Sequence, residues 1–283
     1  MDKAARRTYD RGMAENPTEC RQPRFAMPTG ATDCHFHVYE KGARFPDHEM
    51  DQALALHRRL GIGRGILVQP DVASRAITLK GLAMAGPNYR GVTPIVEVPS
   101  EKEIGALHAI GMRGARFIFL ARHGAKPDIA MMGQTAERIA PFGWHVAFLM
   151  DPQDMLEIFD FLRGLPVPFV LDHMGRLDVT GGLEHPAFQS LLELVRRDNG
   201  WVKLSGADRV SKTGAPYHEA IPYAHALIAA APDRVIWGSD WPHPANPYNP
   251  DDADLVDLIP LIAPDAAQQR KMLVDNPARL IGF

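Results

Sequence analysis

The sequence predicts an α/β fold, a single-domain (β/α)8 barrel of the TIM type. Eight short apolar segments recur along the 283 residues, and segments with the apolar spacing of a helix lie between several of them. The predicted strands are apolar on both faces, which is typical of a parallel sheet buried between two layers. Residues 1–24 are then an N-terminal extension, and residues 25–283 form the barrel domain.

The predicted strands are rich in β-branched and aromatic residues. In chain order they cover residues 31–38, 65–70, 91–98, 114–120, 143–150, 167–175, 200–206 and 234–242. An open doubly wound sheet is the main structural rival, and it usually places a glycine-rich phosphate turn after its first strand. Here the first strand runs into HFHVYE, with no glycine until Gly42. The pattern therefore favours the barrel.

Helices are predicted between the strands, among them residues 51–61, 101–111, 151–164 and 185–200. Ser100 with Glu103 has the spacing of a capping box, and Asp151 precedes Pro152 in a first helical turn. Glycines stand where three of the helices should end, at Gly61, Gly111 and Gly164. Each predicted helix is long enough to cover one pair of strands.

Charge and composition exclude several classes of partner. The formal net charge is −3, so the chain has no overall basic field for nucleic acid or an anionic membrane. The opening stretch MDKAARRTYDRGMAENPTEC lacks the apolar run of a signal peptide, and no later run could span a bilayer. Two cysteines make no disulfide framework. We expect a cytoplasmic protein with a small-molecule substrate, and the sequence leaves a homo-oligomer open.

The first predicted strand carries the segment TDCHFHVYE. Chemistry in a barrel of this type takes place at the C-terminal ends of the strands. Residues two apart on a strand share a face, so Asp33, His35 and His37 are expected to point one way, and Cys34 and Phe36 the other way, toward the helices. His35 and His37 are therefore candidate site residues, and Cys34 is interpreted as a small buried residue.

Two further strand ends carry polar groups. The sixth strand ends in LDHMGR, which places His173 at the rim with Arg176 beyond it, and the eighth ends in WGSDWPHP, which places Asp240 there. The first and eighth strands are neighbours in a closed barrel, so Asp240 should lie beside His35 and His37. Three histidines and an aspartate could hold one Zn²⁺ with an open position, or could act on a substrate directly.

Five segments together resemble the amidohydrolase superfamily: GATDCHFHV, GMRGARFIFLAR, GWHV, DHMGR and RVIWGSDWPHP. Within it, the chain is most similar to the amidohydrolase-related lactonases that act on 2-pyrone-4,6-dicarboxylate and to related lactone hydrolases and isomerases. The similarity runs from about residue 22 to residue 281. It implies hydrolysis of an anionic lactone without a metal, with Asp240 as the base that activates water and with His35, His37 and His173 polarising the ring carbonyl.

The resemblance also assigns substrate-binding residues. Arg116, Arg122 and Arg209 match positions that hold substrate carboxylates in this group, and guanidinium pairs bidentately with carboxylate. Arg176 and Ser74 complete the predicted substrate contacts. Members with two metals add a bridging lysine or carboxylate after the fourth strand and a histidine after the fifth, and neither is found here. No cofactor is expected, and the alternative is one Zn²⁺ held by His35, His37, His173 and Asp240.

Departures from the lactonase pattern fall on the substrate side. The segment EKGARFPDHEM has no counterpart of a substrate-binding tyrosine, and Leu149 stands where a second tyrosine is found in these lactonases. The loop after Gln69 is shorter, with Ser74 as its polar contact. Three alternatives therefore stay open: a related lactone hydrolase or sugar-acid lactone isomerase, a Zn²⁺-dependent decarboxylase of the same superfamily, and a non-catalytic barrel that binds a small acid.

Overall fold

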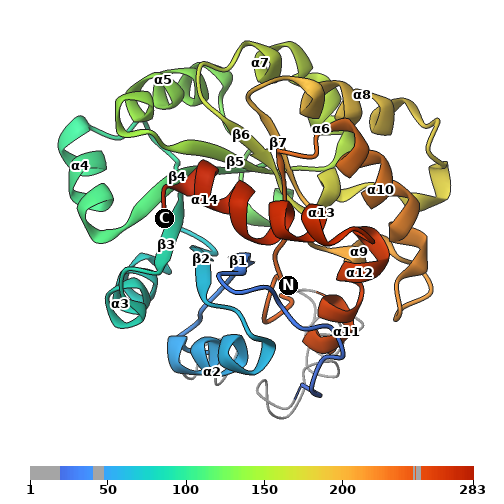
Figure 1. Cartoon of the computed structure of the whole chain (residues 1–283). Coiled ribbons are helices and arrows are strands. Elements are labelled where there is room, and N and C mark those ends of the chain that lie inside the picture. The colour runs from blue at the N-terminus through green and yellow to red at the C-terminus, as the bar shows by residue number, and fades with distance from the viewer. Residues whose placement is uncertain (1–19, 41–47, 245, 247–249) are drawn as a thin grey trace, which may run out of the picture.

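A computed structural model describes residues 20–40, 48–244, 246 and 250–283. Eight parallel strands lie side by side in the order in which they occur in the chain, and helices surround them (Figure 1). The first strand also meets the segment after the eighth, because the N–H groups of Cys34 and His37 donate to the carbonyl oxygens of Trp237 and Trp241 at 2.9 and 2.8 Å. The predicted (β/α)8 barrel is confirmed.

All eight predicted strands are present, and most are shorter than predicted. They are β1 Thr32–Phe36, β2 Arg64–Val68, β3 Tyr89–Pro94, β4 Met112–Ile118, β5 His145–Leu149, β6 Phe169–Leu171, β7 Gly200–Lys203 and β8 Val235–Ile236. The last three are the shortest. The chain leaves the sheet early there, so His173 and Asp240 lie on the loops that follow β6 and β8.

Helices connect the strands and cover the outside of the barrel. They are α2 Met50–Leu60, α3 Arg75–Ala85, α4 Glu101–Ile110, α5 Ile129–Ile139, α6 Pro152–Glu157, α7 Phe159–Gly164, α8 Pro186–Arg196, α9 Ala207–Val210, α10 Ile221–Ala230, α11 Asp252–Asp257, α12 Ile259–Ile262, α13 Ala266–Arg270 and α14 Asn276–Ile281. The helix predicted over residues 151–164 is divided, because the backbone at Ile158 departs from helical geometry, with φ −108° and ψ 19°.

The helix-end signals are largely confirmed. The Ser100 hydroxyl oxygen accepts from the backbone N–H of Glu103 at 3.2 Å and starts α4, whereas the Glu103 side chain pairs with Arg75 of α3 at 3.0 Å. Gly61 and Gly111 end α2 and α4 with φ of 78° and 112°, a region that glycine enters without a steric penalty. Gly164, by contrast, is the last residue of α7.

The barrel interior has an apolar lower half. Inward-facing side chains of the strands pack there with Leu280 and Ile281 of α14; they include Cys34, Ile66, Val92, Ala147, Val170, Trp201 and Ile236. The helix α14 runs across this end of the barrel (Figure 1), and the guanidinium of Arg279 lies 5.0 Å from the centre of a Trp201 ring. Polar chemistry is thereby confined to the opposite end, where the strands finish.

The predicted orientation of β1 side chains is wrong at Asp33 and Cys34. The register between β1 and β2 shifts between Asp33 and Phe36, so Cys34 and His35 together oppose one residue of β2, as in a β-bulge. Cys34 therefore packs inside the barrel, while Asp33 points outward and its Oδ2 lies 3.2 Å from Nε2 of His57 on α2. Cys34 remains a buried structural residue, and burial raises the pKa of its thiol.

Part of the predicted N-terminal extension lies against α11. Arg21 pairs with Asp257 at 2.7 Å and the backbone N–H of Arg24 donates to the same carboxylate at 2.7 Å. Residues 1–19 lie outside the described part of the chain, as do residues 41–47 of the segment without a substrate-binding tyrosine. The boundary between extension and barrel stays a prediction.

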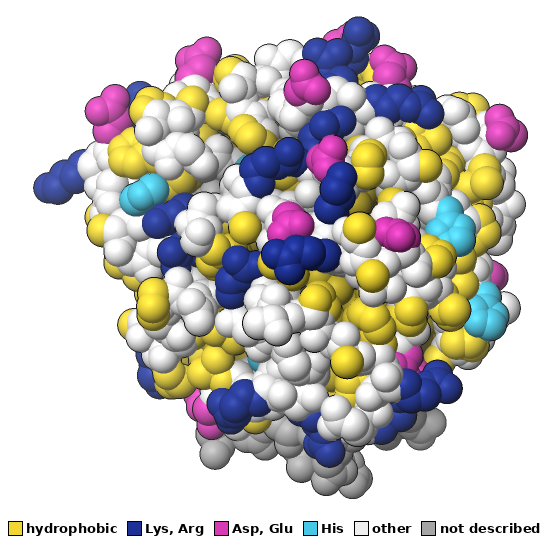
Figure 2. All heavy atoms as spheres, in the orientation of Figure 1, with side chains coloured by type: hydrophobic (Ala, Val, Ile, Leu, Met, Phe, Trp, Pro, Cys, Tyr) yellow, Lys and Arg dark blue, Asp and Glu magenta, His cyan; other side chains and the backbone are white. Residues whose placement is uncertain are grey.

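The surface gives limited information on partners. Among the described residues, no helix is both long and apolar enough to cross a membrane. On the face in Figure 2, basic and acidic side chains are interspersed with apolar ones. The predicted absence of nucleic acid and the oligomeric state are not tested by these observations.

Candidate active site

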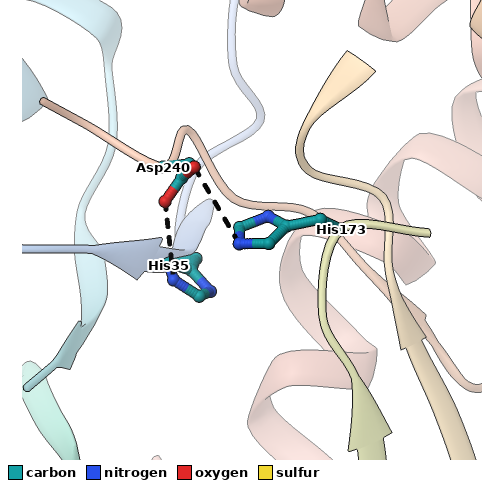
Figure 3. A group of neighbouring side chains, drawn as sticks. All are labelled: His35, His173 and Asp240. Carbon is teal, nitrogen blue, oxygen red and sulfur yellow. Dashed lines mark ion pairs between the residues drawn. The ribbon is translucent and has the colours of Figure 1, made fainter. Parts of the chain in front are cut away.

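The four predicted catalytic residues lie together at the C-terminal end of the barrel. Asp240 Oδ1 is 3.5 Å from His35 Nε2 and 3.4 Å from His37 Nε2, and Asp240 Oδ2 is 3.9 Å from His173 Nε2. Figure 3 shows Asp240 facing the rings of His35 and His173. All four are buried, with exposed fractions of 0 to 4%. The strands β1, β6 and β8 thus deliver their end residues to one point, as the sequence predicted.

The backbone around this cluster is held in uncommon conformations. Asp240 and His173 have φ of 65° and 53°, a region that non-glycine residues rarely adopt and that is enriched at functional sites. Two glycines permit the close approach of neighbouring strands. A Cβ on Gly238 would lie 2.6 Å from the backbone nitrogen of His35, and one on Gly206 would lie 2.9 Å from Cβ of His173.

Arg209 of α9 is the direct partner of Asp240. Its Nε donates to Asp240 Oδ2 at 2.5 Å, its Nη2 also contacts that oxygen, and Nη2 donates to the carbonyl of Pro244 at 3.1 Å. Burial by itself would raise the pKa of Asp240, but Arg209 and His173 outweigh it and hold the pKa well below the ordinary aspartate value. Asp240 is therefore an ionised carboxylate whose Oδ1 accepts no hydrogen bond.

A buried chain of charges supports the cluster from below. Lys203, at the end of β7, donates from Nζ to Nδ1 of His35 at 3.0 Å and to Oδ1 of Asp172 at 2.8 Å. Arg116 of β4 donates from Nε and Nη2 to the other oxygen of Asp172 at 3.1 and 2.9 Å. Burial opposes ionisation of Asp172, but Lys203, His35 and Arg116 hold its pKa well below the ordinary value. We call Lys203, Asp172 and Arg116, together with the four catalytic candidates, the polar centre.

Lys203 and Asp172 were not predicted as site residues from the sequence. A signal was present, since both charges stand at inward positions of segments that are otherwise apolar, WVKLSG and FVLDHMG. A charged residue buried in a strand must be paired, and the same signal is present at Arg116. The sequence could not show that Lys203, Asp172 and Arg116 pair with one another, because they come from three different strand segments.

The remaining histidines have defined hydrogen bonds. The His37 Nδ1–H donates to the Val68 carbonyl at 2.6 Å, and His173 Nδ1 lies 2.9 Å from the Ser205 hydroxyl. Burial, followed by the charge of Lys203, lowers the pKa of His35 to about 3. Burial also lowers the pKa of His173 well below its ordinary value, although Asp240 acts in the opposite direction. Burial thus disfavours the protonated form of both rings.

A pocket of about 380 Å³ is lined in part by Arg209, which contacts Asp240 of the polar centre. We call it the arginine pocket; its walls include Arg122, Arg176, Arg209, Lys212, Asp178 and Asp208. Arg176 donates to Asp151 at 2.6 Å and keeps a quarter of its side chain exposed. Cations outnumber carboxylates among these side chains, so the pocket suits an anionic ligand.

Two predicted substrate contacts lie elsewhere. Arg116 is 2% exposed and belongs to the polar centre, not to the pocket wall. The Ser74 hydroxyl donates to Asp71 at 2.7 Å at the start of α3, and Ser74 does not line the pocket either. These positions follow from local structure: Arg116 points inward from a strand, and Ser74 is taken up by a turn. Their roles toward a substrate stay predictions.

Two further groups beside the polar centre were not recognised in the sequence. Burial, followed by the charge of Asp240, raises the pKa of Tyr39, and its ring centre lies 6.3 Å from that of His37. His243 Nε2 lies 3.1 Å from Oδ1 of Asp252 on α11. Burial alone would lower the pKa of His243, but Asp252 raises it overall. Neither residue stands in a pattern that marks it in sequence.

Comparison with known proteins agrees with this geometry. The sequence profile of the family described as amidohydrolase matches residues 32–283. The chain belongs to the amidohydrolase family.

Curated relatives of this amidohydrolase include lactone hydrolases. A 2-pyrone-4,6-dicarboxylate hydrolase from Comamonas testosteroni is 38% identical, and the match covers 94% of this chain and 93% of that protein. A 4-sulfomuconolactone hydrolase from Rhizobium radiobacter is 36% identical, with 91% and 92% covered. An apo crystal structure of a protein from Agrobacterium tumefaciens is 30% identical, with a TM-score of 0.81 over 92% of this chain and 98% of that one.

The polar centre of this amidohydrolase meets the distance requirement of a metal site. Within the described residues, His35, His173 and Asp240 carry potential ligand atoms that lie within 4.8 Å of one another. Proximity alone does not show that the hydrogen-bonding state of each ligand suits a metal, because a ligating imidazole nitrogen must be unprotonated. That requirement is decided by the partners of each ring.

Proposed function

We propose that this amidohydrolase opens an anionic lactone such as 2-pyrone-4,6-dicarboxylate or a muconolactone by hydrolysis of the ring ester. One observation carries the proposal: the buried Asp240 faces three imidazole rings and is joined by Arg209 to a pocket rich in arginine. The activities named for the curated relatives support the same reaction class. Together they favour acyl chemistry on a small carboxylated ring.

In the proposed reaction Asp240 is the general base. It takes a proton from water as the water oxygen adds to the lactone carbonyl carbon, and the carbonyl π electrons move to the carbonyl oxygen. His35, His37 and His173 surround the place where this oxyanion forms; His35 and His173 are the proposed hydrogen-bond donors to it, and His37 holds His35 in place through its Nε2. When the tetrahedral intermediate collapses, the ring C–O bond breaks and Asp240 returns the proton to the leaving oxygen.

Arg209 links substrate binding to this base. In the free protein its guanidinium contacts Asp240. The arginine therefore occupies the carboxylate to which the attacking water should bind. A carboxylate that enters the arginine pocket offers Arg209 a second anionic partner. We propose that Arg209 turns to the substrate, so that Asp240 becomes free to bind the attacking water only when an anionic ligand is present.

The other predicted arginines divide by position. Arg122 and Arg176 line the pocket and are proposed to bind substrate carboxylates directly. Arg116 uses Nε and Nη2 for Asp172, so its proposed contact with a substrate is made through Nη1. Ser74 is proposed as a peripheral contact, and its bond to Asp71 would have to open for this role.

A lactone isomerase is the second candidate. A curated D-galactarolactone isomerase from Agrobacterium fabrum is 30% identical, and the match covers 95% of this chain and 94% of that protein. The same base and pocket could serve a sugar-acid lactone, with proton transfer in place of attack by water. The product distinguishes the two reactions: a ring-opened acid for hydrolysis, and a second lactone for isomerisation.

A panel of lactones tests the proposal. Pyrone dicarboxylate, muconolactones and aldarolactones are assayed with purified protein, with and without a chelator, and the metal content is measured. We expect ring opening of at least one carboxylated lactone that the chelator leaves unchanged. Activity that disappears on chelation and returns with zinc contradicts the metal-free mechanism, and the absence of turnover on every lactone favours a binding protein.

A further inference from the structure

Lys203 is a buried cation whose place in the polar centre has a specific chemical consequence. It is 3% exposed, and its Nζ lies 2.8 Å from Oδ1 of Asp172 and 3.0 Å from Nδ1 of His35. The contact with Asp172 is that of an ammonium with an ionised carboxylate, a charge-assisted hydrogen bond. An ammonium has three N–H donors and no lone pair, so it can only donate to His35.

This contact decides which nitrogen of His35 carries the proton. Because Nδ1 accepts from Lys203, a neutral His35 ring must be protonated on Nε2. The neighbouring ring agrees with this assignment. The Val68 carbonyl can only accept, so His37 is protonated on Nδ1. Its Nε2, 3.2 Å from Nε2 of His35, can then accept the Nε2–H of His35. The hydrogen bonds run in one direction from Lys203 to Val68.

The same hydrogen bonds conflict with a metal ion. Nε2 is the ring nitrogen of His35 that faces His37 and Asp240, so a metal in this centre would need a lone pair at Nε2. Histidines that ligate metals donate their other ring N–H to a carboxylate, a carbonyl or water. Here the other nitrogen meets a cation. The donor set therefore does not fit a metal, although the distances do.

We propose that Lys203 fixes His35 in the Nε2–H tautomer and thereby makes it a hydrogen-bond donor to the substrate and keeps the polar centre free of metal. The inference rests on the proposed metal-free hydrolysis. Lys203 is a positioning residue, since it acts on the substrate through His35.

The structure also predicts what replaces this arrangement when Lys203 is removed. Asp172 Oδ1 lies 3.5 Å from His35 Nδ1, and Arg116 still holds the other carboxylate oxygen at 2.9 Å. With Lys203→Met, His35 can donate Nδ1–H to Asp172 and present a lone pair at Nε2. The result is the carboxylate–histidine pair found behind metal ligands, built from residues already in place.

Metal titration of variants tests the proposal. Zn²⁺ binding is measured by calorimetry and Co²⁺ binding by visible absorption for the wild type, Lys203→Met, Lys203→Arg, which keeps a cationic donor, and Lys80→Met, an exposed control on α3. We expect Lys203→Met to bind one ion about 10- to 100-fold more tightly than the wild type, whereas Lys203→Arg and Lys80→Met should bind it no more tightly than the wild type. The double variant Lys203→Met, Asp240→Asn should lose that binding. Equal metal affinity in the wild type and Lys203→Met overturns the proposal.

A spectroscopic measurement identifies the tautomer of His35 directly in the wild type. Histidine ring ¹⁵N shifts distinguish a protonated from an unprotonated nitrogen, and His35 can be assigned by comparison with His35→Asn. We expect Nδ1 of His35 to be unprotonated and Nε2 to carry the proton. A proton on Nδ1 contradicts the inference whatever Lys203→Met does. Neither measurement uses a lactone, so their failure is distinct from a failure of the proposed reaction.

Discussion

The polar centre and the arginine pocket differ in how they are held. The polar centre is built from strand ends and the first residues after them, and its side chains are fixed by contacts such as that of Lys203 with Asp172. The arginine pocket is built from loops and short helices, where Arg122 is exposed and Arg176 is partly exposed. Sites on strands are more rigid than sites on loops. The centre is thus suited to one reaction, and the pocket to variation of the substrate.

The predicted departures from the lactonase pattern spare the four catalytic candidates. They are the shortened segment after Gln69 and Leu149 in place of a tyrosine, and neither lines the arginine pocket. Changes in the centre should therefore abolish catalysis or folding, whereas changes in the pocket should alter binding.

The largest effect is expected from Asp240→Asn. The amide cannot take a proton from water, so ring opening should fall by about 10² to 10⁴-fold, while a product acid still binds through the pocket. Single-turnover assays and calorimetry measure the two effects. Asp160→Asn, whose carboxylate is exposed on α7, is the matched control. Wild-type turnover in Asp240→Asn would show that the base lies elsewhere.

The next effect is on stability. Asp172→Asn leaves the buried Lys203 and Arg116 without their shared anion, and the free energy of unfolding should fall by about 3–5 kcal/mol. Denaturant unfolding followed by circular dichroism measures the change. If stability is unaltered, the charges must be compensated by another group, and the centre is less rigid than the contacts indicate.

The pocket should respond through binding. Arg122→Ala and Arg176→Ala each remove a cation proposed to hold a carboxylate, so KM should rise about 10- to 100-fold with little change in kcat. Steady-state kinetics with a dicarboxylated and a monocarboxylated lactone show whether each arginine contacts one substrate carboxylate or only adds positive charge to the pocket. Arg196→Ala on α8 is the control. A fall in kcat at constant KM would assign these arginines to the reaction itself.

A pH effect on stability is expected from the lower barrel. Burial lowers the pKa of His145 to about 3 from 6.5, so between these values the unfolded chain binds the proton more strongly. The free energy of unfolding should therefore fall as the pH drops from 6.5 toward 3. His145→Gln should flatten that slope by at most about 1.4 kcal/mol per pH unit. Chemical unfolding at several pH values compares the two proteins, and parallel slopes would contradict the assignment.

The smallest effect is expected at Ser74. Its hydroxyl donates to Asp71 and lies away from the pocket wall, so Ser74→Ala should alter KM less than either arginine variant. Kinetics on the same lactones provide the test. A loss equal to that of Arg122→Ala would mean that the turn at Asp71 opens toward the substrate.

Sequence periodicity predicted the barrel and the meeting of His35, His37, His173 and Asp240, because strand order alone brings the ends of β1, β6 and β8 to one rim. It failed within β1. A β-bulge has no signature in TDCHFHVYE, so the predicted directions of Asp33 and Cys34 were wrong. The sequence identified the arginines. Which of them belong to the polar centre and which to the arginine pocket depends on the direction in which each side chain points.

The sequence by itself determined the architecture and the inventory of candidate catalytic groups, since these depend on spacing along the chain. Only the tertiary structure decided the partners of those groups: Arg209 on Asp240, and Lys203 between Asp172 and His35. These contacts join residues 31 to 168 positions apart, and no local pattern encodes a pairing across strands. The position of the proton on His35 follows from the contact with Lys203 alone. It also decides whether the polar centre suits a metal.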